Sequence, residues 1–448
     1  MAARQHDERS RKIVHLAFGC GALALRYLLW WQAAVVAAAA LAFNLVILPR
    51  VAGQLYRPGE RPRSVGSGIV LYPASVLLLI VVFHDRLDIA AAAWAILAVG
   101  DGMATLVGRR IGRGGLPWNP EKSLAGTLAL FVCGGVAGAA VAWWCRPNVA
   151  PQPEVWFSIA APLVAALVAA FVETIPIKLD DNISVPASAA AALWALSLVR
   201  AELVWPAVLT GGQATVLATA ANVVVAWVGY RAGMVTSAGA LTGAAIGVTI
   251  TMTTGWSGWT LLMATFLAAS ISSRLGLRRK TLLGIAEERG GRRGPENAIA
   301  NTGLAAVAAL LAVSTLHRDL ALLAFVTALA AGGSDTIASE IGKAWGRRTY
   351  LVSTFRRVAP GTSGAMSLEG TLAGVVGAAV LGAIGAAGGL IPQTAIVAVV
   401  AGATIGALAE SVLGATLEAP GILNNDMLNF LNTAIAASAA MCVAGLLS

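Results

Sequence analysis

The sequence predicts an all-α, polytopic integral membrane protein with about fifteen transmembrane helices in two tandem related halves. Of its 448 residues, 58% are apolar and only 12% are charged, whereas a soluble protein has about 25% charged residues. Apolar runs of roughly 17 to 25 residues recur along the chain, each long enough to cross a hydrocarbon core of about 30 Å. Such runs indicate helices, because lipid tolerates only helices and closed barrels.

The expected transmembrane segments alternate with short polar or glycine-rich connections. They lie near residues 14–29, 31–48, 67–83, 88–107, 123–144, 156–175, 184–199, 213–230, 236–253, 257–273, 297–315, 319–338, 367–388, 393–413 and 427–447.

The basic residues indicate the orientation in the membrane. A net charge of +9 could suggest a nucleic-acid partner, but most of the 31 lysines and arginines fall in alternate loops, as the positive-inside rule describes. We therefore expect no nucleic-acid binding. We expect a cell (inner) membrane protein whose N-terminus and active sites are cytoplasmic. The sequence does not indicate an oligomeric state.

A repeat relates the two halves of the chain. Residues 101–113 and 335–347 share Asp, Ala, Gly, Gly and Arg at identical offsets, and 123–129 agrees with 367–373 at six of seven positions. In each half an acidic residue then ends a segment, and an Asp/Asn cluster follows. The pattern favours two domains, 1–205 and 206–448.

The first half contains candidate catalytic residues, which are Asp101, Lys122 and Asp181. A carboxylate at membrane depth is costly and indicates a functional site, although Asp101 could also be a helix-end residue in water. Glu173, Asp180 and Asp181 add the hard oxygen ligands that Mg²⁺ prefers; a solvated turn is the alternative for the Asp-Asp-Asn stretch. With Asp101, these residues could form a magnesium–nucleotide site for phosphoryl transfer to a lipid alcohol.

The loop after Asp101 is a candidate phosphate site. Glycine backbone N–H groups can point at an anion, and basic side chains neutralise it. A helix N-terminus, which Ser123 could cap, also favours phosphate. An ordinary positive-inside loop would have the same composition. The residues expected to bind nucleotide or phosphate here are Gly108, Arg109, Gly112, Arg113, Ser123 and Gly126.

The motifs of the first half resemble the phytol kinase and dolichol kinase family. They are RKIVH (11–15), GDGMATLVGRRIGR (100–113), EKSLAGT (121–127) and VETIPIKLDDNISVP (172–186). The resemblance implies an integral membrane enzyme that phosphorylates an isoprenoid alcohol, typically with CTP. It implies that Asp101 and Asp181 hold magnesium and that Lys122 holds the nucleotide phosphates.

The second half resembles the phytyl-phosphate kinase family, which converts an isoprenyl phosphate to the diphosphate. The resemblance rests on GRRGPENAIANTG (291–303), SDTIASEIG (334–342), PGTSGAMSLEGTLAG (360–374), ESVLGATLE (410–418) and NNDMLNFLNT (424–433). It implies a fusion of two consecutive kinases. The residues expected to act here are Asp335 and Asp426 in catalysis, Asp335, Glu340, Glu410, Asn425 and Asp426 at the metal, and Gly342, Lys343, Gly364, Ser367 and Gly370 at the phosphates.

Other functions fit parts of the pattern. A cytidylyltransferase would use CTP to make a CDP-lipid, and a transporter of an anionic lipid or metabolite can also have duplicated helical halves. One half could also be inactive. The informative charges gather at one end of the segments rather than at the bilayer midplane, which favours an enzyme that takes nucleotide from the cytosol.

Overall fold

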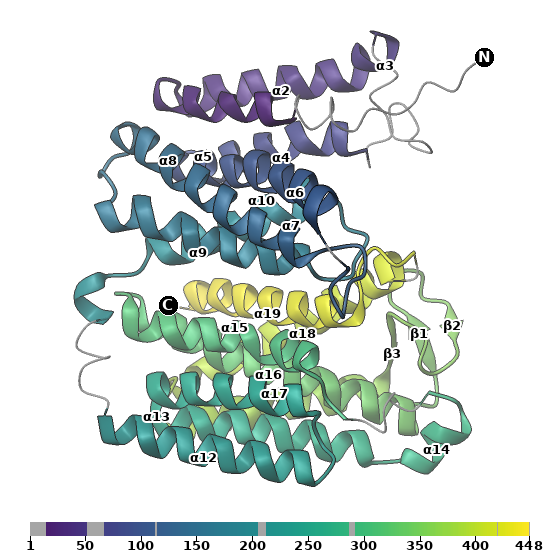
Figure 1. Ribbon diagram of the computed structural model, residues 1–448. Coiled ribbons are helices and arrows are strands. Elements are labelled where there is room, and N and C mark those ends of the chain that lie inside the picture. The colour runs from purple at the N-terminus through teal and green to yellow at the C-terminus, as the bar shows by residue number, and fades with distance from the viewer. Residues whose placement is uncertain are drawn as a thin grey trace. The chain divides into compact units, whose positions relative to one another are not determined.

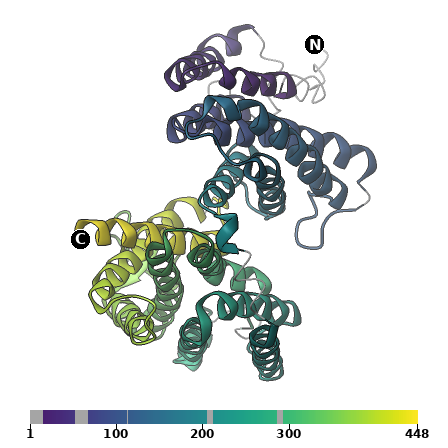
Figure 2. The ribbon, with the colours of Figure 1, turned by 90° about the vertical axis from the view of Figure 1, so that its left-hand side faces the viewer.

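A computed structural model describes residues 15–51, 67–112, 114–204, 212–285, 292–418 and 420–447. The chain divides into two compact units, Met1–Ser197 and Leu198–Ser448. Each unit consists mainly of helices that pack side by side (Figures 1 and 2). Among the described residues, nine helices are long and apolar enough to cross a membrane. The protein is therefore an all-α integral membrane protein, as predicted, whereas the expected count of fifteen spans is not confirmed.

The first unit contains the α-helices of the first half and four short 3₁₀ or π segments. In chain order these are η1 (Cys20–Arg26), α2 (Trp30–Val46), α3 (Leu48–Val51), α4 (Gly68–Val82), α5 (Leu87–Ala95), η3 (Ile96–Asp101), α6 (Gly102–Ile111), α7 (Leu124–Ala129), η4 (Leu130–Gly134), α8 (Gly135–Cys145), η5 (Arg146–Asn148), α9 (Val155–Glu173) and α10 (Asp181–Ser197).

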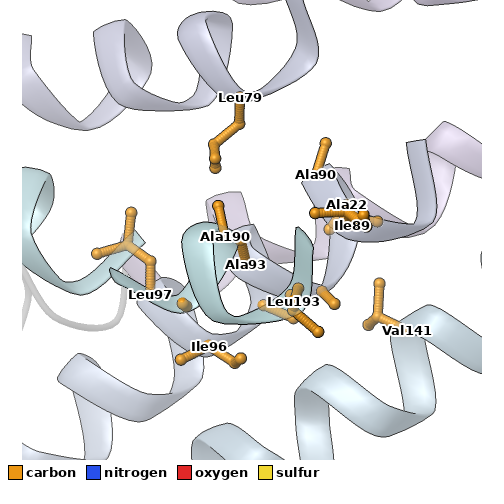
Figure 3. Close-up of a cluster of buried hydrophobic side chains, with 14 of the residues drawn as sticks. Ala22, Leu79, Ile89, Ala90, Ala93, Ile96, Leu97, Val141, Ala190 and Leu193 are labelled. Atoms are coloured by element: carbon orange, nitrogen blue, oxygen red, sulfur yellow. The ribbon is translucent and has the colours of Figure 1, made fainter. Parts of the chain in front are cut away.

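Alanine dominates the core of the first unit. Figure 3 shows Leu79 of α4 pointing toward Ala190 of α10, with Ala90 and Ala93 of α5 nearby. Small side chains let helix backbones approach closely, and close packing stabilises helix contacts where lipid removes the hydrophobic driving force. This core packs α5, α9 and α10 against one another.

Two π-helical segments lie inside membrane-length helices of the first unit. One is η3, which ends at Asp101, and the other is η4. They pack against each other so closely that a Cβ on Gly100 would lie 3.3 Å from Cα of Gly134. A π segment inside a helix often marks a functional site.

The second unit contains the helices of the second half and three short strands. They are α12 (Gly212–Arg231), α13 (Ser237–Arg274), α14 (Leu277–Leu282), α15 (Pro295–Ser314), α16 (Arg318–Trp345), β1 (Thr349–Leu351), β2 (Arg357–Val358), β3 (Ala365–Ser367), α17 (Leu368–Ala387), η7 (Gln393–Ala395), α18 (Ile396–Leu413), η8 (Gly414–Glu418) and α19 (Asn425–Leu447). Helix α16 is central and packs against α13, α15, α17, α18 and α19. Its Phe325, Val326 and Leu329 are fully buried.

Three details differ from the expected segments. Within 14–29, residues 15–19 are α-helical and continue into the seven-residue 3₁₀ helix η1, and this segment is not among the nine candidate spans of the described residues. The segments expected at 236–253 and 257–273 are joined in α13, which kinks at Gly255 with φ 69°, a conformation that glycine adopts without strain. The strands form an antiparallel sheet of order β2-β1-β3 between α16 and α17.

Candidate functional site

Three carboxylates of the first unit converge at helix ends. Asp101 ends η3, Glu173 ends α9 and Asp181 begins α10. One carboxylate oxygen from each lies within 4.8 Å of the other two, and Asp101 and Glu173 are buried. Carboxylates this close repel one another unless positive charge lies between them.

Lys122 supplies positive charge to this cluster. Its Nζ lies 2.7 Å from Oε1 of Glu173 and 2.9 Å from Oδ2 of Asp181. Burial by itself would lower the pKa of Lys122, but the charges of Asp181 and Glu173 outweigh burial and raise the pKa above its usual range. Lys122 is therefore held as a cation. Three carboxylates and one ammonium leave a net negative site, which suits a divalent cation.

A buried asparagine fixes the loop that carries Lys122. Asn119 Nδ2 donates a hydrogen bond of 3.1 Å to the carbonyl of Thr174, just after α9. The loop also closes on itself, because Leu116 N donates to the Lys122 carbonyl at 2.8 Å. These bonds link the position of Lys122 to the end of the helix that carries Glu173.

Two residues at this site, His15 and Tyr72, were not among the expected site residues. His15 Nε2 lies 3.5 Å from Oδ2 of Asp101, and its ring packs edge-on against Tyr72 with ring centres 4.5 Å apart. Trp94 Nε1 donates a 2.8 Å hydrogen bond to the Tyr72 hydroxyl. The motif RKIVH ends in His15 and was the one sequence signal that could have identified it.

Asp180 caps the start of α10, and its role at the metal stays a prediction. Its Oδ1 accepts hydrogen bonds from the backbone N of Asn182 at 2.9 Å and from Asn182 Nδ2 at 2.6 Å. The Asn182 Oδ1 atom is buried and has no hydrogen-bond partner among the described residues. A buried acceptor of this kind favours a bound donor or cation. The residues present therefore fit a hard divalent cation.

A cavity of about 320 Å³ opens beside this cluster. Of the expected site residues, Asp101, Lys122, Asp180 and Asp181 line it, together with His15, Tyr72, Lys178 and Asn182. Glu173 does not line the cavity, but it forms an ion pair with Lys122, which does. The lining does not include Gly108, Arg109, Gly112, Ser123 or Gly126, and Arg113 lies outside the described residues.

The glycines after Asp101 pack α6 against α7. A Cβ on Gly112 would lie 2.3 Å from the Gly108 carbonyl oxygen and 2.6 Å from Ser123 Oγ, while a Cβ on Gly126 would lie 3.0 Å from the Ala104 carbonyl oxygen. Ser123 caps α7 by accepting a hydrogen bond from Gly126 N at 3.2 Å. Close packing thus accounts for these small residues, and their role in phosphate binding stays a prediction.

We expect Gly112→Ala to destabilise the protein by about 1 to 3 kcal/mol, because the added methyl group overpacks the contact between α6 and α7. Thermal unfolding in detergent measures the effect. Ile111→Ala is the matched control, because Ile111 is 64% exposed at the same helix end and exposed sites usually change stability by less than about 0.5 kcal/mol. Equal melting temperatures for Gly112→Ala and the parent protein would contradict the packing interpretation.

The second unit has a cavity of about 250 Å³ where α16, α17 and α18 meet the connection that contains the sheet. Asp335 of α16 and Glu410 of α18 both line this cavity. The Glu410 Oε2 atom is buried without a hydrogen-bond partner among the described residues. The expected residues that line the cavity are Asp335, Gly342, Lys343, Gly364, Ser367, Gly370, Glu410 and Asn425.

Glu340 and Asp426 do not line this cavity. Glu340 is buried and forms ion pairs with Lys280 and Lys343; the Lys343 Nζ lies 3.0 Å from its Oε1. Lys280 is buried as well and donates to the Ser273 carbonyl at 2.7 Å. This network was missed from the sequence. It places Lys343 between Glu340 and the cavity, and it gives Glu340 a structural partner.

The sheet helps to shape the second cavity. Backbone pairing of Thr349 with Ser367 joins β1 to β3, and Ser367 then caps α17 by accepting from Gly370 N at 3.1 Å. A Cβ on Gly364 (φ 72°) would lie 2.3 Å from the Ser411 carbonyl oxygen. Only glycine allows the connection this close to α18.

Comparison with known proteins identifies the family. The profile of the integral membrane protein family DUF92 matches residues 220–437. The uncharacterized membrane protein sll0875 of Synechocystis is 40% identical over 199 residues, which are 44% of this chain and 77% of that protein. The chain belongs to the DUF92 family of integral membrane proteins.

Other relatives are similar over smaller parts of their length. Protein VTE6 of Arabidopsis thaliana is 39% identical over 189 residues, 40% of this chain and 56% of that protein. Phytol kinase 1 of Arabidopsis thaliana is 30% identical over 128 residues, 28% of this chain and 42% of that protein. The matches to these two relatives thus span less than two thirds of their length. No solved structure matches the chain at a significant level.

Proposed function

We propose that this DUF92 protein is a membrane kinase that transfers the γ-phosphoryl group of CTP to an isoprenoid alcohol. The main support for this proposal is the cluster of Asp101, Glu173 and Asp181 around Lys122. Phosphoryl transfer needs metal ions, positive charge on the phosphates and an oriented acceptor more than covalent chemistry from the protein. The similarity to phytol kinases supports an isoprenoid alcohol as the acceptor.

In this proposal the alcohol oxygen attacks the γ-phosphorus of the nucleotide. The bond between that phosphorus and the β–γ bridging oxygen breaks, which yields the isoprenyl phosphate and CDP. The alcohol proton leaves as the new bond forms, and His15, which lines the cavity beside Asp101, is a group that can accept it. When the nucleotide binds, Lys122 exchanges its ion pair with Glu173 or Asp181 for contacts with phosphate oxygens.

The carboxylates Asp101, Glu173 and Asp181 would hold Mg²⁺. When bound, the ion neutralises charge on the phosphates. The positive-inside distribution supports a cytoplasmic active site in the cell membrane, where nucleotide is available.

We expect chelation of divalent cations to abolish phosphorylation and added Mg²⁺ to restore it. Glu173→Gln should raise the Mg²⁺ concentration for half-maximal rate by about tenfold or more, the scale for disturbing a metal site. Glu154→Gln is the control, because Glu154 lies at the opposite end of α9 and is exposed. An unchanged Mg²⁺ dependence in Glu173→Gln would contradict this assignment of the metal ligands.

We propose that the second unit phosphorylates the resulting monophosphate to the diphosphate. Asp335, Glu410 and Asn425 would hold the metal, and Lys343 would contact the phosphates. Local geometry supports a common origin for the two units. Ser123 caps α7 beside Gly108, and Ser367 caps α17 beside Gly342; in both pairs, a Cβ added to the glycine would lie 3.1 Å from the serine Oγ.

The primary test uses membranes that contain the protein. They are incubated with phytol or geranylgeraniol, Mg²⁺ and γ-labelled CTP, with ATP, GTP and UTP in parallel, and the labelled lipids are separated. We expect labelled mono- and diphosphate. Label transferred only from α-labelled CTP would instead establish a cytidylyltransferase. Absence of labelled lipid from every nucleotide, in membranes where the protein is folded, would overturn the kinase proposal and favour a transporter.

A further inference from the structure

A second cavity of the first unit has apolar walls. It has a volume of about 210 Å³ and lies between η1, α2, α4 and α5. Its walls include Ala33, Ala37 and Ala40 of α2, Val76 and Ile80 of α4, and Trp94 of α5. The three alanines are spaced by four and three residues, so they lie on one face of α2. Small residues on that face leave the space that larger side chains would fill.

The apolar cavity adjoins the carboxylate site. Phe18, Asn44 and Tyr72 line both cavities. Tyr72 is held in place by the hydrogen bond from Trp94 Nε1, and Asn44 Nδ2 donates to the Ile69 carbonyl at 2.8 Å. Polar atoms therefore stand at one end of the apolar cavity, where it meets the site of Asp101 and Lys122.

The wall of the apolar cavity that α2 forms lies at the edge of the unit. In α2, the buried residues are Ala33 and Ala37, and both line the cavity. Val36 also lines it and is 61% exposed, so this wall of the cavity reaches the surface of a membrane-length helix. A wall exposed on a membrane-length helix is where a bilayer-soluble molecule would enter the cavity.

We propose that this apolar cavity binds the isoprenyl tail of the alcohol and directs its hydroxyl group to the carboxylate site. This inference rests on the proposed function. From Ala33 to Asn44 the wall formed by α2 is about 16 Å long at 1.5 Å per residue, enough for several isoprene units. An amphiphile with one hydroxyl and a long unbranched or methyl-branched hydrocarbon matches a polar cavity joined to an apolar one.

The cavity distinguishes alcohols by the length and shape of their tails and not by the free energy of transferring the tail out of water. A tail that moves from lipid into an apolar cavity exchanges one apolar surrounding for another, as in helix association within membranes. Binding of the tail in the cavity lowers the barrier by positioning, because it holds the hydroxyl group near the γ-phosphorus. A side chain that shortens the cavity should therefore change the preference for tail length more than it changes the reaction itself.

The test uses a larger side chain on α2 that fills part of the cavity. Ala40→Leu should lower the ratio of kcat/KM for geranylgeraniol to that for geraniol by about tenfold or more, the scale on which a pocket discriminates hydrocarbon size. Ala39→Leu is the matched control, because Ala39 neighbours Ala40 but is exposed and does not line the cavity. Val76→Phe fills the same cavity from α4 and should shift the ratio in the same direction.

The outcomes separate the tail site from the kinase proposal. Phosphorylated lipid with an unchanged length ratio in both Ala40→Leu and Val76→Phe overturns the tail site alone. If the parent protein phosphorylates no alcohol, the proposed function fails, and a photoactivatable geranylgeraniol probe then tests the cavity directly. Labelling of α2 and α4 that unlabelled geranylgeraniol competes away supports the tail site. Absent labelling, or equal competition by a bilayer phospholipid, overturns it.

Discussion

Asp101→Asn should reduce formation of the isoprenyl monophosphate by roughly a hundredfold to a thousandfold, the range for removing one preorganised electrostatic group. The substitution keeps the shape of the side chain but removes a negative charge from the cluster with Glu173 and Asp181. The cluster beside Lys122 then has one negative charge fewer, and its affinity for a divalent cation falls. The measurement is the rate of labelled monophosphate formation from geranylgeraniol in detergent-solubilised protein.

Two controls belong with Asp101→Asn. Asp85→Asn removes an aspartate whose side chain is 87% exposed, so it should leave the rate unchanged. Thermal unfolding of Asp101→Asn shows whether the variant folds, because loss of a buried charge near His15 could alter stability as well. A folded Asp101→Asn protein with the parent rate would show that the carboxylate cluster is not the catalytic site.

The positions of the charged groups in the first site could be predicted because each lies at a helix end. Asp101 ends one apolar run, Glu173 ends another and Asp181 begins a third. Helix ends on one face of a membrane come within reach of one another once the helices pack, and the positive-inside rule indicates which ends share a face. Their catalytic roles stay predictions that the variants test.

His15 and Tyr72 could not be predicted in the same way. No spacing rule relates His15 to Asp101, which lies 86 positions later. Their proximity results from the packing of the η1 region and α4 on the helix that carries Asp101. The sheet between α16 and α17 escaped prediction for another reason, since its strands have only two or three residues and cannot show an alternating pattern.

Glycine and acidic residues were ambiguous in the sequence. Glycine serves both phosphate loops and close helix contacts, so the sequence alone could not distinguish the two roles for Gly108 and Gly112. The structure places both beside Ser123, which accounts for their small size and leaves their role at the phosphates a prediction. Glu340 follows Asp335 by five positions, which separates their side chains by about 140° around a helix of 3.6 residues per turn. That angle explains why Glu340 reaches Lys280 while Asp335 lines the cavity that Glu410 also lines.

Asp335→Asn should leave monophosphate formation intact and block the diphosphate, so that labelled monophosphate accumulates. Asp335 lines the second cavity with Glu410 and Lys343, and its carboxylate would be a metal ligand there. We expect the second step to fall by roughly a hundredfold to a thousandfold, the range for removing one preorganised electrostatic group. The ratio of diphosphate to monophosphate is the direct measurement.

Each of the variants Asp335→Asn and Asp101→Asn is a control for the reaction step that the other variant tests. If each unit has one site, Asp101→Asn protein supplied with isoprenyl monophosphate should still make diphosphate, because its second cavity is untouched. Asp335→Asn protein supplied with the same monophosphate should not. Loss of both steps in either variant would mean that the two units form one catalytic entity, whereas retention of both steps in Asp335→Asn would mean that the second unit contributes structure rather than a second phosphorylation.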